Sequence, residues 1–108
     1  MTSSRREKIE ALLKDDPEDV FLRYSLALEL DDTDEWERGL DILEELARGT
    51  PPYVPAFHMA ARRLLARDRV AEARRALREG IEAARAQGEA HAAAEMSELL
   101  MSLGDAGE

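Results

Sequence analysis

The chain has 108 residues, enough for one domain, and it contains no cysteine, which excludes a disulfide scaffold and any cysteine-ligated metal site. Its formal net charge of -9 at pH 7 argues against nucleic acid and against an anionic membrane surface as partners, because both need basic patches. No apolar run approaches the ~20 residues of a membrane span, and no apolar stretch follows the N-terminal basic residues, so the expected compartment is the cytoplasm.

Apolar side chains recur at helical spacing throughout the chain, and no segment shows the strict alternation of a half-buried strand. Acidic clusters, glycine and proline interrupt the pattern at Pro17 and at residues 31–34 and 49–52. Asp34 and Glu37 have the spacing of a capping box at the start of the third helix. The sequence therefore predicts an all-α protein of about six helices, at residues 4–15, 21–30, 36–47, 53–67, 70–86 and 89–103.

The segment 62–85 is locally basic and rich in arginine, although the chain as a whole is acidic. One interpretation is a solvated helix face with ion pairs one turn apart, such as Arg75 with Glu79 and Arg78 with Glu82. The other is a site for an acidic partner, because the arginine fork suits carboxylates.

The predicted helices also repeat along the chain. Short turns between them require antiparallel packing of neighbours. The third and fifth helices match at one constant offset, which pairs Trp36 with Val70, Gly39 with Ala73, Leu43 with Leu77 and Leu46 with Gly80. In the second and fourth helices we match Phe21 with Phe57 and Ser25 with Ala61, at a slightly longer offset. The small residues are then expected to face each other where helices cross closely.

A helix–turn–helix period of about 34 residues, as between Trp36 and Val70, resembles the tetratricopeptide repeat. The pattern residues of that family are matched in one repeat by Phe57, Ala60, Ala61, Leu64, Val70, Ala73, Leu77 and Gly80. The resemblance implies antiparallel helix hairpins stacked into a right-handed superhelix, an α-solenoid. It divides the single domain, residues 1–108, into an orphan helix at 4–15, repeat one at 18–50, repeat two at 53–87 and a C-terminal capping helix at 89–103.

The resemblance also implies a concave groove, lined by the first helix of each repeat, that binds a peptide or a partner helix. The first hypothesis is therefore a noncatalytic protein–protein interaction module in which apolar side chains supply affinity and arginine supplies orientation. The last helix is expected to add Ala92 and Met96 to this face. The expected contact residues are Leu22, Arg23, Leu26, His58, Met59 and Arg62.

Two alternatives stay open. Short repeat arrays often cover their open end by pairing, so the chain is a candidate homodimer through a terminal helix. A hydrolase or a metal-binding protein is the less favoured alternative, since the sequence has only His58 and His91 and no HExxH, GxSxG or glycine-rich phosphate motif. With Glu95 these histidines offer a three-ligand zinc set. No catalytic residue, metal or cofactor is predicted.

Overall fold

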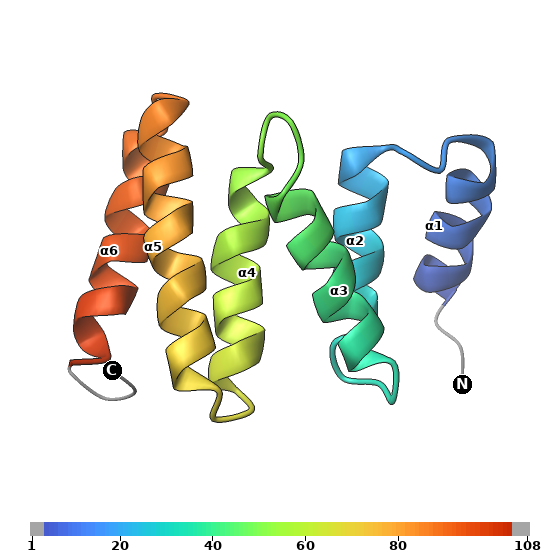
Figure 1. Ribbon diagram of the computed structural model, residues 1–108. Coiled ribbons are helices and arrows are strands. Elements are labelled where there is room, and N and C mark those ends of the chain that lie inside the picture. Colours follow the sequence, from blue (N-terminus) through green and yellow to red (C-terminus); the bar gives the residue numbers. More distant parts are fainter. Residues whose placement is uncertain (1–3, 105–108) are drawn as a thin grey trace.

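The computed structural model describes residues 4–104, which form six α-helices and no strand. Each helix packs antiparallel against the next in chain order (Figure 1). The all-α prediction of about six helices is confirmed. The helices are α1 (Ser4–Asp15), α2 (Val20–Leu30), α3 (Trp36–Ala47), α4 (Val54–Leu65), α5 (Val70–Ala86) and α6 (Ala90–Ser102).

The turns after α4 and α5 close in the same way. Asp68 and Gly88 each have a positive φ, 58° and 73°, a conformation open to glycine and tolerated by aspartate. The backbone N–H of the next residue donates to the carbonyl of Leu64 at 2.9 Å in one turn and of Ala84 at 2.8 Å in the other. These bonds satisfy carbonyls at each helix end and direct the chain into the antiparallel neighbour.

The helix starts are capped differently from the sequence prediction. The Asp19 carboxylate accepts a hydrogen bond of 2.8 Å from the Leu22 N–H and caps α2. The predicted capping box of Asp34 with Glu37 is wrong, because Glu35 occupies the residue before α3 and no side chain caps that helix. The Thr33 hydroxyl instead accepts from the Glu35 N–H at 3.0 Å and shapes the turn.

The apolar core runs along the array from α2 to α6, with a smaller cluster between α1 and α2. Its fully buried members come from successive helices, so each helix covers the apolar face that its neighbour leaves open, as in other solenoids. The largest of them are Leu30, Leu43, Leu64, Leu77 and Met96.

The first and the second helix of the hairpin recur after the same number of residues. The interval from the start of α2 at Val20 to the start of α4 at Val54 equals the interval from α3 to α5. A Cβ built on Gly39 has as its nearest neighbours Ala27 and Leu30, which lie one such repeat before the buried pair Ala61 and Leu64. Ala27 therefore stands at the crossing of α2 with α3, where Ser25 was expected.

The predicted match of Phe21 with Phe57 is wrong for the same reason. Phe21 is 67% exposed in the first turn of α2, whereas Phe57 is 6% exposed in the core. Only small side chains fit where two backbones come close, so the alanines fix the register and the aromatic residue does not. In the observed register Arg23 takes the place that Phe57 takes in the next repeat.

Gly80 is the second close crossing. A Cβ at this position of α5 would lie 2.6 Å from the Phe57 Cβ of α4 and 2.6 Å from the Met96 Sδ of α6. Three helices thus converge on a residue without a side chain, which accounts for a glycine in the middle of a helix where it costs about 1 kcal/mol relative to alanine.

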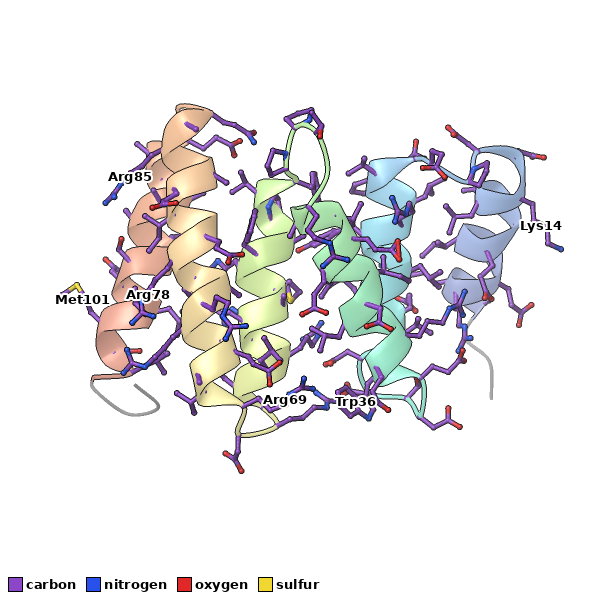
Figure 2. The ribbon with its side chains drawn as sticks, in the orientation of Figure 1. Lys14, Trp36, Arg69, Arg78, Arg85 and Met101 are labelled. Atoms are coloured by element: carbon purple, nitrogen blue, oxygen red, sulfur yellow. The ribbon has the colours of Figure 1, made fainter. Side chains whose placement is uncertain are left out.

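A polar cluster joins the two repeats at one edge. The Asp31 carboxylate, just after α2, lies 2.8 Å from the Arg63 Nε of α4 and 3.7 Å from the Arg67 guanidinium. The Arg67 guanidinium also stacks 3.8 Å above the ring of Trp36 at the start of α3. Figure 2 shows Trp36 and Arg69 at this edge, where the α2–α3 and α4–α5 turns lie.

Candidate functional site

Helices α2, α4 and α6 enclose a hollow on one side of the array. It has a volume of about 290 Å³ and combines apolar walls with a few charged groups. Its lining consists of Tyr24 from α2, Val54, Pro55, His58, Met59 and Arg62 from α4, and Glu89, Ala92, Glu95 and Met96 at the start and along the face of α6.

A second hollow of about 310 Å³ continues along α4 and α6. It shares His58, Arg62 and Glu95 with the first and extends to Glu98 and Ser102 at the far end of α6. Because three residues line both hollows, they form one continuous depression, which we call the α4–α6 groove.

His58 lies in the middle of this groove and is half-buried. Burial lowers the pKa of the imidazole, the positive charge of Arg62 lowers it further, and Glu95 opposes both effects. Its Nε2 atom is inaccessible to solvent and has no hydrogen-bond partner within the described part of the chain. The imidazole is therefore neutral at pH 7, and its Nε2 is a buried polar atom beside charged neighbours.

Tyr24 closes the groove at the α2 end. Its ring packs edge-on against Tyr53, with centroids 5.3 Å apart and an interplanar angle of 71°. Burial raises the pKa of the Tyr24 hydroxyl, with a smaller contribution from Tyr53, so the group stays protonated. The pair holds an aromatic surface between the two repeats.

The structure brings together three of the six residues expected to contact a partner. His58, Met59 and Arg62 all line the α4–α6 groove. Arg23 lines a neighbouring hollow beside Tyr53, and its guanidinium is bound to the Glu45 carboxylate at 2.7 Å. The groove partners of these α4 residues come from α6 and from one residue of α2.

The other two expected residues lie elsewhere. Leu22 is half-buried near the start of α2 and does not line the groove. Leu26 is 4% exposed and packs in the α1–α2 cluster with Ile9 and Leu30. The prediction that the Leu26 side chain is exposed on the concave face is wrong, because α1 covers this side chain.

Tyr24 is a groove residue of α2 that is not among the predicted contact residues. It stands one repeat before His58, so the same offset that pairs Ala27 with Ala61 would have found it. Ala92 and Met96 were expected on this face from the last helix, and both line the groove.

The three-ligand zinc set of His58, His91 and Glu95 is not assembled. Within residues 4–104 no group of three or more histidine, aspartate or glutamate side chains is placed to hold a metal ion. His91 is exposed and lies 3.5 Å from the Glu95 carboxylate one turn later in α6. Across this same stretch, the helices are too short or too polar to cross a membrane.

The chain is similar to a solved structure with the same arrangement of helices. This is the solution NMR structure of a tetratricopeptide repeat domain protein from Salinibacter ruber, with a TM-score of 0.76. The two sequences are 32% identical, and the likeness covers 84% of this chain and 92% of that one. No family model and no curated protein matches the sequence.

Proposed function

The chain belongs to the tetratricopeptide repeat family, and we propose that it is a noncatalytic module that binds a peptide or a partner helix in the α4–α6 groove. Folds of this kind commonly mediate protein–protein interaction. The observation that carries the proposal is the continuity of the two hollows along α4 and α6, which share His58, Arg62 and Glu95.

The chemistry of the groove favours a segment with both apolar and polar side chains. Tyr24, Met59 and Ala92 supply apolar surface, and methionine adapts its shape to different partners. Arg62 is exposed above this surface and provides a fork for a carboxylate or a backbone carbonyl. The proposed contact residues are therefore His58, Met59 and Arg62, with Tyr24 and Ala92 added and Arg23 at the margin.

Peptides selected from a displayed random library on the immobilised full chain test this proposal. Calorimetry with Arg62→Ala should show affinity about tenfold weaker, as for a central contact at an interface. Arg85→Ala removes another exposed arginine, from α5, and serves as the matched control, with unchanged affinity expected. Selected peptides that bind Arg62→Ala as tightly as the original chain would refute the proposed groove.

Self-association is a second candidate function, supported by the two ends of the array. Leu12 in α1 is 54% exposed and Phe21 in α2 is 67% exposed, while Met101 at the other end is 79% exposed and points away from α6 (Figure 2). Exposed apolar side chains of this size mark contact surfaces when they are close together. A dimer in light scattering that Phe21→Ser dissociates supports this candidate, and a monomer at all concentrations rejects it.

A further inference from the structure

The opposite side of α4 carries a separate hollow. It has a volume of about 460 Å³ and lies between α3 and α5, with Phe57, Ala60 and Leu64 of α4 as its floor. At 3.6 residues per turn these three residues lie on the side of α4 that faces away from His58 and Arg62. We call it the α3–α5 groove after the two helices on either side of α4 (Figure 1).

The walls of this groove are formed by small side chains. Ala47 of α3 faces Ala76 and Ala83 of α5, which lie two turns apart on the same side of their helix. Ala76 and Ala83 are partly exposed although they pack against the core. Space therefore remains between α3 and α5 for an apolar side chain supplied from outside.

Carboxylates dominate the rim. Glu44 lies on the α3 side, and Glu72, Glu79 and Glu82 lie on the α5 side, against Arg48 and Arg75. The Glu72 carboxylate is engaged, because it accepts two hydrogen bonds of 2.8 Å from the Arg69 guanidinium.

Glu79 and Glu82 are exposed, and neither forms an ion pair with another residue in the described range 4–104. The i,i+4 pairing expected for these two glutamates from the sequence is therefore not formed. Two exposed negative charges one turn apart thus border an apolar hollow, within a segment that is otherwise rich in arginine. Such a rim attracts a cationic partner and repels an anionic one.

We propose that the α3–α5 groove is a second docking surface, for a basic segment of a partner protein. An apolar side chain of that segment inserts among Ala47, Ala76 and Ala83, and flanking lysines or arginines lie beside Glu79 and Glu82. This surface does not depend on the α4–α6 groove, so the chain can engage two segments on opposite sides of α4.

A synthetic amphipathic peptide of about four helical turns, with leucines on one face and lysines on the other, is the probe. Added to the ¹⁵N-labelled full chain, it should shift the amide signals of Ala76, Glu79 and Ala83. A matched peptide with glutamate in place of lysine should leave them unchanged. A third peptide with serine in place of leucine should bind more weakly, because the apolar insertion is lost.

The double variant Glu79→Gln/Glu82→Gln should weaken binding of the lysine peptide about tenfold, as expected for losing two partly screened charge pairs. Asp15→Asn/Glu18→Gln removes the same charge from exposed positions at the end of α1 and in the turn after it, and should have little effect. Equal weakening by both variants, or no binding, overturns the proposal. Shifts confined to His58 and Arg62 also overturn it, while they support the α4–α6 groove.

Discussion

Gly39 of α3 lies against Ala27 of α2 so closely that a Cβ on the glycine would stand 3.0 Å from the Ala27 carbonyl oxygen. Backbone atoms cannot move aside as the end of a flexible side chain can. This contact sets the distance between the two helices of the first hairpin, and it explains why the matching residue of the next repeat, Ala73, is also small and buried.

Substitution of Gly39 by leucine should therefore destabilise the fold. Overpacking of a close contact costs about 1–3 kcal/mol, which corresponds to a fall in melting temperature of about 4–8 °C for each kcal/mol in a domain of this size. Ala94→Leu introduces the same side chain at an exposed position of α6 and should leave the melting temperature nearly unchanged. A Gly39→Leu variant that melts with the original chain would contradict the observed crossing.

Gly80→Ala should lower the free energy of unfolding even though alanine is the better helix former. The gain in helix propensity is about 1 kcal/mol, but the new methyl group would lie 2.6 Å from the Phe57 Cβ, which is fixed to its backbone. Denaturant unfolding of the variant decides the sign. An increase in stability would mean that α4, α5 and α6 do not converge at this residue.

The extent to which the fold could be predicted differs between its parts. The helices and their turns follow from local signals, since Pro17, residues 31–34 and residues 49–52 interrupt the apolar spacing and bound the observed helices. The register of α2 was missed, because Phe21 resembles Phe57 in chemistry but not in burial. The register is decided by how closely two backbones approach at a crossing. That short distance requires a small residue, which is Ala27, and the position of an aromatic residue such as Phe21 does not indicate it.

The candidate site was predictable on α4 and only in part on the other helices. His58, Met59 and Arg62 share one face of a single helix, so their clustering follows from helical spacing. Tyr24 is placed beside them only in the correct register of α2. Leu26 does not line the groove because α1 packs over it. The α3–α5 groove depends on the separation of two helices, which no local pattern in the sequence encodes.

His58 should make stability depend on pH. Its folded pKa is lowered below the ordinary value of about 6.5 by burial and by Arg62, so the unfolded chain takes up the proton first as the pH falls. The free energy of unfolding is therefore expected to decrease as the pH drops below about 6.5, because the unfolded state then binds more protons.

His58→Gln should flatten that decrease, while His91→Gln, at an exposed position, should preserve it. Chemical denaturation between neutral pH and the onset of carboxylate titration provides the measurement. The same slope in His58→Gln as in the original chain would show that the imidazole is not desolvated by the groove.

The stacking of Arg67 on Trp36 should couple the two repeats energetically. A double-mutant cycle with Trp36→Leu and Arg67→Met isolates this contact from the ion pair that Arg67 makes with Asp31. The expected coupling is about 0.5–1 kcal/mol, the range for a partly exposed cation–π pair. Additive effects of the two substitutions would mean that the stacking contributes nothing to stability.

Intermolecular nuclear Overhauser effects between the full chain and a selected peptide test the central claim most directly, namely that α2, α4 and α6 form one binding groove. Binding in this groove predicts contacts from the peptide to the Tyr24 ring and to the methyl groups of Met59 and Ala92. Contacts confined to Leu22, or contacts absent from all three helices, would contradict it.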